Sequence, residues 1–460
     1  MRGTDGGRDE VVARLRDALG VRVSVDPDDL ETTRTDASGH RSGASPLAVV
    51  SAESVEDVQA TMRIATDTRT PVVTRGAGTG AAGGAIAGAG QIVLSTLRMT
   101  SIHEIRPDDL LAVVDPGIFN GELNAVLAEQ GLWWAPDPAS REISTVGGNI
   151  ATGAGGLLCA KYGAVREAVL GVDVVVPDGR LLRLGHRSVK GVTGLDLTAL
   201  MVGSEGTLGV IVRATLKLRR KTLGAERTIL GTFPDVRSAA AASAAVTAAG
   251  LQPALMELMD SAALAAVHDL LGLVRPAEGT AHLTIQTDGP AAADEAEAIA
   301  AVLGARGGET VMSDDPTEGE RLLAIRRSAH AAMQALGDTL LEDIAVPRSA
   351  LPAMFDEIAR IEREFGLVIP TVAHAGDGNL HPSFVFEGPE VPDVVWAAAS
   401  EMFSSALRLG GTLTGEHGVG VLKSRWLADE LGDDQWELQR RIKEVFDPLC
   451  ILNPGKVFAR

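Results

Sequence analysis

Two short glycine-rich stretches contain side chains that could bind a metal ion or act as a base. AHAGDGNLH places His374 and His381 seven positions apart, and TGEHGVG adds Glu416 and His417. Two imidazoles and a carboxylate form a three-ligand set with an open coordination position, as a catalytic Zn²⁺, Mn²⁺ or Fe²⁺ requires. On one continuous strand the two histidines would face opposite sides, so we expect a glycine-mediated reversal that returns both to one side.

The residues between the histidines, 376 to 379, are interpreted as a tight turn. Asp377 and Asn379 are expected to shape the turn or support the ligands rather than coordinate an ion. Any single histidine is more often an ordinary core or surface residue than a ligand. That interpretation is weaker here because imidazole and carboxylate groups occur together in glycine-rich segments.

A second kind of chemistry is indicated by TRGAGTGAAGG, residues 74–84, directly after the apolar PVVT. Its glycines allow positive φ and bring successive backbone N–H groups against a ligand, the arrangement that holds a diphosphate. The loop lacks the GK[ST] ending of a nucleotide-triphosphatase loop, and no acidic ribose ligand ends a following strand. Taken alone, it is equally consistent with a tight turn.

Further small-residue segments follow in the same half of the chain. Small side chains and hydroxyls in this number suit a long, narrow channel in which backbone amides hold a large, flat cofactor and its diphosphate. Ordinary turns rarely run ten residues with Thr and Ser interleaved. The segments are PDPAS (136–140), STVGGNIATGAGG (144–156), KYG (161–163) and GSEGTLGVI (203–211).

Single basic residues lie beside these motifs, notably Arg326, Arg348 and Lys456. Arginine is the natural bidentate partner of a carboxylate. For Arg326 and Arg327, however, a solvated helix face is the favoured interpretation from the sequence alone.

The composition restricts the partners. The 460 residues include 42 basic and 61 acidic side chains, a formal charge of -19, which disfavours nucleic acid and anionic lipid. A small anionic substrate would need local cations. Cys159 and Cys450 alone cannot form a disulfide framework or a cysteine zinc site. The N-terminus lacks a secretory h-region and no stretch is long enough to span a bilayer, so we expect a cytoplasmic protein.

The elements that must position these residues follow from apolar periodicity and turn signals, and the length predicts two or three domains. The first half reads as strands 46–50, 71–74, 91–95, 110–117 and 208–219, helices 9–19, 51–68 and 118–130, and a hairpin over 169–185. From about residue 221, strands 226–233, 281–289 and 340–347 alternate with helices 236–249, 291–303, 316–336, 350–365 and 393–409. The histidine motif lies in a strand, turn and strand, which together predict an α+β second domain.

Taken together, the motifs resemble the FAD-linked 2-hydroxyacid dehydrogenases, the glycolate oxidase catalytic subunit and D-lactate dehydrogenase group of the vanillyl-alcohol oxidase superfamily. The resemblance runs from about Pro46 to Lys456 in matching order and spacing. It is carried by RGAGTG, PDPAS, VGGNIAT, KYG, GSEGTLGVI, EDIAVPRS, HAGDGNLHP, TGEHGVG and FDPLCILNPGK.

This resemblance implies an α+β fold. An FAD-binding domain of the p-cresol methylhydroxylase type, with two α+β subdomains, is expected over 1–221. A cap domain with an antiparallel sheet covered by helices is expected over 222–412, and a C-terminal segment over 413–460 returns to the first domain.

The resemblance also implies roles for individual residues. His374, His381 and Glu416 become the ligands of a divalent metal, His417 the base at the substrate hydroxyl, and Arg326 the clamp on its carboxylate, with Asn379 as a further catalytic residue. FAD is expected to be non-covalent, because loop 76–84 has no histidine to attach it. The implied FAD contacts are Arg75, Gly76, Ala77, Gly78, Thr79, Gly80, Pro136, Ser140, Thr145, Gly148, Asn149, Ala151, Gly206, Ile211 and Asn453.

The chain departs from the family pattern at a few positions. Gly153 stands where an asparagine is usual, which puts one contact near the flavin in doubt, and Leu158 stands where an arginine is common. His330 and Leu341 occupy positions that carry a hydroxyl residue and a lysine in related 2-hydroxyglutarate enzymes. The last two departures weaken the expectation of a dicarboxylate substrate.

The expected activity is oxidation of a D-2-hydroxy acid of the glycolate or D-lactate type to the 2-oxo acid, with metal assistance and hydride transfer from C2 to flavin N5. A metal-dependent hydrolase, an oxygen-using FAD oxidase of another alcohol and an inactive flavin-binding subunit stay open. The electron acceptor is expected to be separate: a quinone, an iron–sulfur subunit or an electron-transfer flavoprotein. Peripheral attachment at the inner membrane through a partner and a homodimer are also left open.

Overall fold

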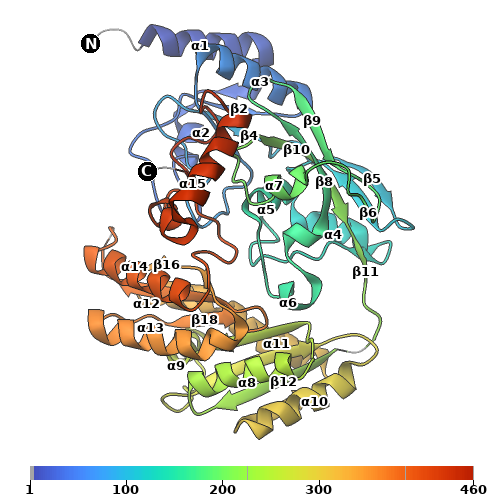
Figure 1. Cartoon of the computed structure of the whole chain (residues 1–460), viewed down its shortest axis with the longest axis vertical. Helices are drawn as coiled ribbons and strands as arrows, with labels where there is room; N and C mark the ends of the chain where they lie inside the picture. Colours follow the sequence, from blue (N-terminus) through green and yellow to red (C-terminus); the bar gives the residue numbers. More distant parts are fainter. Residues whose placement is uncertain (1–4, 225, 389, 459–460) are drawn as a thin grey trace. The chain divides into compact units, whose positions relative to one another are not determined.

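The computed structural model describes residues 5–224, 226–388 and 390–458 (Figure 1). The first four residues of the predicted first domain and the last two of the predicted C-terminal segment lie outside this part. The described chain forms two compact units. Within the described residues, unit 1 comprises 5–155, 163–221 and 416–458, and unit 2 comprises 156–162, 222–224, 226–388 and 390–415.

Unit 1 contains a small, mostly parallel sheet in the order β1-β2-β4-β3. β2 and β3 both pair in parallel with β4, and β1 pairs antiparallel with β2. These strands are short, and their buried residues are apolar while each ends in a polar, partly exposed residue. Their bounds are Val23–Ser24 for β1, Ala48–Ser51 for β2, Val72–Arg75 for β3 and Ile92–Ser95 for β4.

A second sheet in unit 1 is antiparallel, in the order β5-β6-β10-β8-β9. The predicted PDG hairpin joins β8 to β9, and Trp134 is fully buried in the core beside this sheet. The strands are β5 (Ile102–Arg106), β6 (Leu111–Val114), β8 (Val169–Val175), β9 (Leu181–Gly185) and β10 (Val210–Lys217), and a separate pair is formed by β7 (Leu132–Trp133) and β11 (Arg219–Arg220).

Seven helices of unit 1 lie within the described residues. Ser54 caps α3 by accepting the N–H of Asp57, as its place in the sequence predicts. The helices are α1 (Asp5–Leu19), α2 (Pro27–Thr32), α3 (Val55–Thr68), α4 (Asn120–Ala128), α5 (Val146–Thr152), α7 (Leu197–Met201) and α15 (Leu427–Phe446).

Unit 2 is built on one antiparallel sheet in the order β15-β12-β14-β13-β18-β19-β16, with β17 also pairing with β19. Side chains alternate between its faces. The strands are β12 (Arg227–Phe233), β13 (Leu255–Met259), β14 (Ala281–Thr287), β15 (Glu309–Ser313), β16 (Asp338–Leu341), β17 (Ile344–Ala345), β18 (Thr371–His374) and β19 (Asn379–Phe386).

Helices cover both faces of this sheet. α8 and α10 pack on the face that carries Leu283 and Ile285, whereas α11 packs on the opposite face, which carries Glu257 and Thr284. α13 packs on α8 through an apolar stripe that includes Met354. The helices are α6 (Cys159–Tyr162), α8 (Val236–Ala248), α9 (Ser261–Leu271), α10 (Ala292–Ala305), α11 (Pro316–Arg327), α12 (Ala329–Leu336), α13 (Leu351–Phe365) and α14 (Asp393–Arg408).

Several elements differ from the sequence prediction. The helix expected over 316–336 is two helices that meet at Ser328, whose hydroxyl donates back to the carbonyl of Ala324. The strand expected over 340–347 is divided between β16 and β17. The sequence reading also missed β13, because Glu257 interrupts its apolar run.

Candidate functional site

The glycine-rich loop of unit 1 packs closely against the segment that begins α5. A Cβ added to Gly76 would lie 2.4 Å from Oγ1 of Thr145. That hydroxyl caps α5 by accepting the N–H of Gly148 at 3.2 Å. Two predicted cofactor segments are therefore in direct contact, and at this position only a glycine allows the backbone to approach.

The C-terminal segment joins the same cluster through Asn453. Its Nδ2 donates to the carbonyl oxygens of Gly84, at 3.0 Å, and Glu205, at 2.6 Å. The neighbouring Gly206 has a positive φ of 70°, and a Cβ there would lie 2.2 Å from Oγ1 of Thr74. The structure thus brings together the predicted segments at residues 74–84, 145–152, 203–211 and 453.

Two basic residues of this cluster donate hydrogen bonds to backbone carbonyls. Arg75 donates to the carbonyls of Thr35 and Ala85, both at 3.0 Å, so it braces the glycine-rich loop from inside. Lys456 donates to the carbonyl of Ile86 at 2.7 Å. Burial lowers the pKa of Lys456 to about 8, although the negative charges of Asp36 and Glu205 act to raise it.

The remaining predicted cofactor residues all belong to unit 1. Asn149 is 4% exposed, and none of the described residues hydrogen-bonds its Nδ2. A buried amide of this kind suits a bound polar ligand, so the site fits a flavin nucleotide. The carbonyl of Pro136 accepts from Asn120, and that of Ala151 accepts the N–H of Glu205. The others are Ala77, Gly78, Thr79 and Gly80 in the loop, Ser140 before α5 and Ile211 in β10.

Gly153 has a simple structural explanation. It ends α5 with a left-handed backbone, at a φ of 69°. Glycine and asparagine are the residues that adopt this conformation most readily, so the exchange of one for the other preserves the helix end.

In unit 2 the predicted reversal is present. β18 and β19 form a hairpin in which Val372 pairs with His381 and His374 pairs with Asn379. His374 and His381 therefore share one face, with ring centroids 5.0 Å apart in an edge-on arrangement. Gly378 makes the turn possible, because its φ is 90° and a Cβ would lie 2.1 Å from the carbonyl oxygen of Val346.

A buried carboxylate that the sequence reading missed connects two predicted site residues. Glu257 of β13, 1% exposed, accepts from Nδ1 of His374 at 2.8 Å and pairs with Arg326 at 2.9 Å. Burial raises the pKa of Glu257, but the positive charges of His374 and Arg326 outweigh it and hold the pKa below its usual value. Arg326 is 9% exposed, so the interpretation as a solvated helix face is wrong for this residue. Arg327 is half exposed and pairs with Glu320.

The second histidine has a carboxylate neighbour as well. Oδ1 of Asp343 lies 3.8 Å from Nδ1 of His381, and Oδ2 of Asp343 accepts from the hydroxyl of Thr414 at 2.5 Å. Asn379 is 6% exposed, and no described residue hydrogen-bonds its Oδ1. Asp377 accepts the N–H of Asn379, which is the turn role expected from the sequence.

These contacts fit a metal ion. A carboxylate bound to Nδ1 orients an imidazole so that Nε2 would be the ligand atom, an arrangement typical of metal-binding histidines. Two further predicted residues, Glu416 and His417, belong to unit 1, where Glu416 lies beside Gly155.

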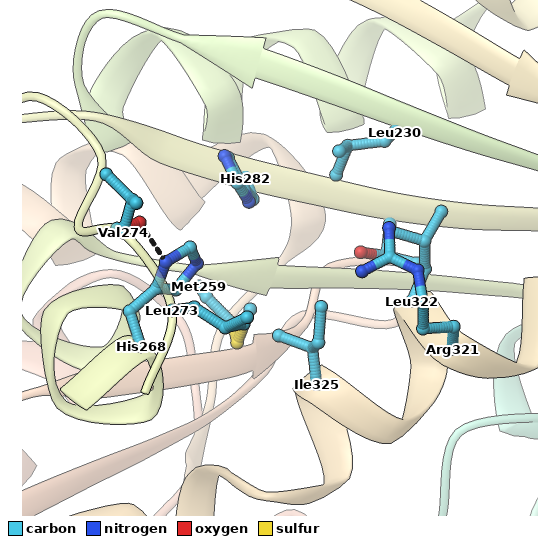
Figure 2. A pocket seen from close by; sticks show the side chains of 10 residues that line it. Leu230, Met259, His268, Leu273, Val274, His282, Arg321, Leu322 and Ile325 are labelled. Atoms are coloured by element: carbon cyan, nitrogen blue, oxygen red, sulfur yellow. Dashed lines mark hydrogen bonds between the residues drawn. The ribbon is translucent and has the colours of Figure 1, made fainter. Parts of the chain in front are cut away.

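Unit 2 also has a cavity of about 290 Å³ on the sheet face that carries Glu257 (Figure 2). Thr284, which pairs with Glu257, and Leu322, one turn before Arg326, both line it. His282 lines it too, and burial, followed by the charge of His268, lowers the pKa of His282 to about 4. None of the predicted site residues lines this cavity.

Comparison with known proteins accounts for both units. Residues 224–457 match the family described as FAD linked oxidases, C-terminal domain, and residues 46–185 match the FAD binding domain. The chain belongs to the FAD-linked oxidase family. It is therefore an FAD-linked oxidoreductase, and the resemblance read from its motifs is confirmed.

Curated relatives cover most of the chain. It is 36% identical over 423 residues to the glycolate oxidase subunit GlcD of Bacillus subtilis, with 90% of this chain and 89% of the relative covered. It is also 36% identical over 419 residues to a D-lactate dehydrogenase of Archaeoglobus fulgidus, with 90% and 92% covered.

Solved structures confirm the predicted fold class. p-Cresol methylhydroxylase superposes with a TM-score of 0.79 at 17% identity, covering 100% of this chain and 98% of that one. The 4-ethylphenol oxidase of Gulosibacter chungangensis gives a TM-score of 0.78 at 17% identity, with 99% and 98% covered. Among the described residues, no helix combines the length and apolar character needed to cross a bilayer.

Proposed function

We propose that this member of the FAD-linked oxidase family oxidises a D-2-hydroxy acid of the glycolate or D-lactate type to the corresponding 2-oxo acid. The proposal is supported by the names of its relatives and by the histidine pair of unit 2. The observation that carries it is Glu257, which holds His374 and Arg326 together in a buried environment. Imidazole and guanidinium groups are the groups that a negatively charged hydroxy acid requires.

In this proposal His374, His381 and Glu416 hold a divalent metal ion, Zn²⁺, Mn²⁺ or Fe²⁺. When bound, the ion lowers the pKa of the substrate hydroxyl, and FAD accepts the two electrons that leave C2 as hydride. Backbone amides and small side chains of the unit 1 cluster hold FAD without a covalent bond, as the fit around Gly76 and Asn149 supports.

Arg326 binds and orients the substrate carboxylate. One guanidinium nitrogen is engaged by Glu257, while no described residue hydrogen-bonds its Nε. A fixed guanidinium keeps the acid in one orientation, which lowers the entropic part of the barrier. In a chain with a formal charge of -19, it also supplies the local positive charge that an anionic substrate requires.

His417 takes the hydroxyl proton, and Asn379 directs its side-chain oxygen towards the substrate. With the proton removed to His417 and the hydride removed from C2, the alcohol carbon becomes a carbonyl, and two electrons and two protons have left the substrate. The electrons must then pass to a separate acceptor, such as a quinone, an iron–sulfur subunit or an electron-transfer flavoprotein.

The test is an anaerobic absorbance experiment on the purified protein. We expect a yellow protein with flavin bands that are bleached by D-lactate or glycolate, and much more slowly by L-lactate. A colourless protein that takes up no FAD would contradict the cofactor. A yellow protein that no 2-hydroxy acid bleaches would contradict the substrate class.

A further inference from the structure

Glu205, in the GSEGTLG segment of unit 1, binds the segment that follows His417. Its Oε1 accepts the N–H of Val419 at 2.7 Å, and its Oε2 accepts the N–H of Gly420 at 2.8 Å. The side chain reaches across 214 positions of sequence to make the first of these bonds. At 8% exposure it is the acceptor for two consecutive amides, of which that of Gly420 is buried and that of Val419 is partly buried.

The chain is shaped around this carboxylate. Gly418 has a φ of 87°, and a Cβ there would lie 3.0 Å from Oε1 of Glu205. A Cβ on Gly84, in the glycine-rich loop, would lie 3.2 Å from Oε2. Side chains at either position would crowd the carboxylate, so glycines line both of its sides.

The main chain of Glu205 is fixed as well. Its N–H donates to the carbonyl of Ala151 in α5 at 2.8 Å, and its carbonyl accepts from Asn453. Its φ is 49°, a left-handed conformation that a non-glycine residue adopts only where its surroundings impose it. Glu205 therefore joins the cofactor segments to the segment that carries Glu416 and His417.

Two lysines act on this carboxylate, and an aspartate acts on one of them. Burial raises the pKa of Glu205 to about 7, while the bonds from Val419 and Gly420 and then the charges of Lys423 and Lys456 lower it. Asp36 faces Lys456 and raises the pKa of that lysine. The ionised form of Glu205 is the stronger acceptor for the two amides, because protonation places a hydrogen on one oxygen and removes the negative charge that strengthens both bonds.

We propose that ionised Glu205 is a positioning residue that holds residues 418–420 in place and thereby fixes Glu416 and His417 for the reaction. This inference rests on the proposed function, in which those two side chains act. The N–H groups of Val421 and Leu422 also bind this segment to the carbonyl of Ala82. Loss of the bonds to Glu205 would therefore loosen residues 418–420 without releasing the whole segment, while the cofactor segments, held by Asn453 and Thr145, stay in place.

The test compares Glu205→Gln with Glu205→Asp and with the control Asp57→Asn in the full-length FAD-loaded protein. Asp57 is also a buried acceptor of a backbone N–H, that of Glu53, but it lies in α3. We expect Glu205→Gln to lower kcat about tenfold or more, because a charged hydrogen bond is lost, with FAD content unchanged. We also expect Asp at this position to restore part of the activity, and Asp57→Asn to match the wild type.

The pH dependence supplies a readout that a purely structural role would not give. The wild-type kcat should fall as pH decreases through about 7, and Glu205→Gln should lack the part of this fall that protonation of Glu205 causes. The contribution of Glu205 to folding stability should have the opposite pH dependence and fall as pH rises. Because the folded pKa is raised, the stabilising contribution is complete below the unfolded value of about 4.3 and is lost as pH rises to about 7. Glu205→Gln should remove that slope.

Amide hydrogen exchange over residues 416–423 separates this inference from the proposed function. Faster exchange there in Glu205→Gln, with unchanged exchange in loop 74–84, supports the positioning role of Glu205. This holds even if no hydroxy acid reduces the wild-type flavin, because that result would contradict only the proposed function. Unchanged exchange, or a wild-type kcat and pH profile in Glu205→Gln, would overturn the positioning role of Glu205. Loss of FAD in proportion to activity would also overturn it.

Discussion

Unit 1 and unit 2 build their sites from different parts of the chain. In unit 1 the close contacts are made by backbone and glycine, as at Gly76 against Thr145 and Gly206 against Thr74. In unit 2 they are made by buried charged side chains, above all Glu257 with His374 and Arg326. Backbone contacts suit a large cofactor that binds by shape and diphosphate, whereas charged side chains suit a small anion and a metal ion. The two units should therefore fail in different ways when they are altered.

The largest effect is expected from Glu257→Gln, which removes the charge that orients His374. Loss of such a supporting carboxylate typically lowers metal affinity or activity about 10- to 100-fold. We expect kcat with a hydroxy acid to fall within that range while the FAD content stays at the wild-type value, as measured by absorbance.

The matched control for this change is Glu278→Gln, an exposed carboxylate of unit 2. It should leave turnover unchanged. If Glu257→Gln lost FAD, or if it turned over as fast as the control, the separation of roles between the units would be broken.

A smaller effect is expected from Gly76→Ala in unit 1. The new methyl group would meet Oγ1 of Thr145, so the loop must shift and FAD affinity should fall about tenfold, or ~1.4 kcal/mol. The turnover of each FAD-loaded molecule should remain near that of the wild type. Titration of the apoprotein with FAD gives the affinity.

Gly43→Ala is the control for that titration, because a Cβ at Gly43 meets nothing within 4 Å. Equal FAD affinities for the two variants would show that the close approach at Gly76 does not shape the cofactor site. A fall in turnover per bound FAD would show that unit 1 contributes to more than cofactor binding.

The same contrast explains what the sequence could predict. The glycine-rich segments are contiguous, so their composition alone indicates a cofactor cradle, and the reversal between His374 and His381 follows from the glycines between them. Glu257 could not be assigned in this way, because it lies 117 positions from His374 and its only local signal is one carboxylate in the apolar run LMELM. Arg326 was misread for the same reason, since its partner lies on a distant strand.

Asp343 and Glu205 were within motifs that carried the family resemblance, EDIAVPRS and GSEGTLG, but no role followed from the motifs themselves. Their contacts, with Thr414 and with Val419 and Gly420, depend on tertiary packing. A carboxylate among small or apolar residues is the signal that could have singled out Glu205, and the pair Glu342 and Asp343 in an otherwise apolar predicted strand is the corresponding signal for Asp343, because a buried charge requires a specific partner.

Metal removal tests the central claim most directly. The protein should be treated with a chelator, dialysed, and mixed anaerobically with D-lactate or glycolate while the flavin absorbance is followed. We predict that the treated protein stays yellow but is no longer bleached, and that added Zn²⁺, Mn²⁺ or Fe²⁺ restores bleaching. Bleaching at the untreated rate, with FAD bound and the metal shown to be absent, would contradict the assignment of His374, His381 and Glu416.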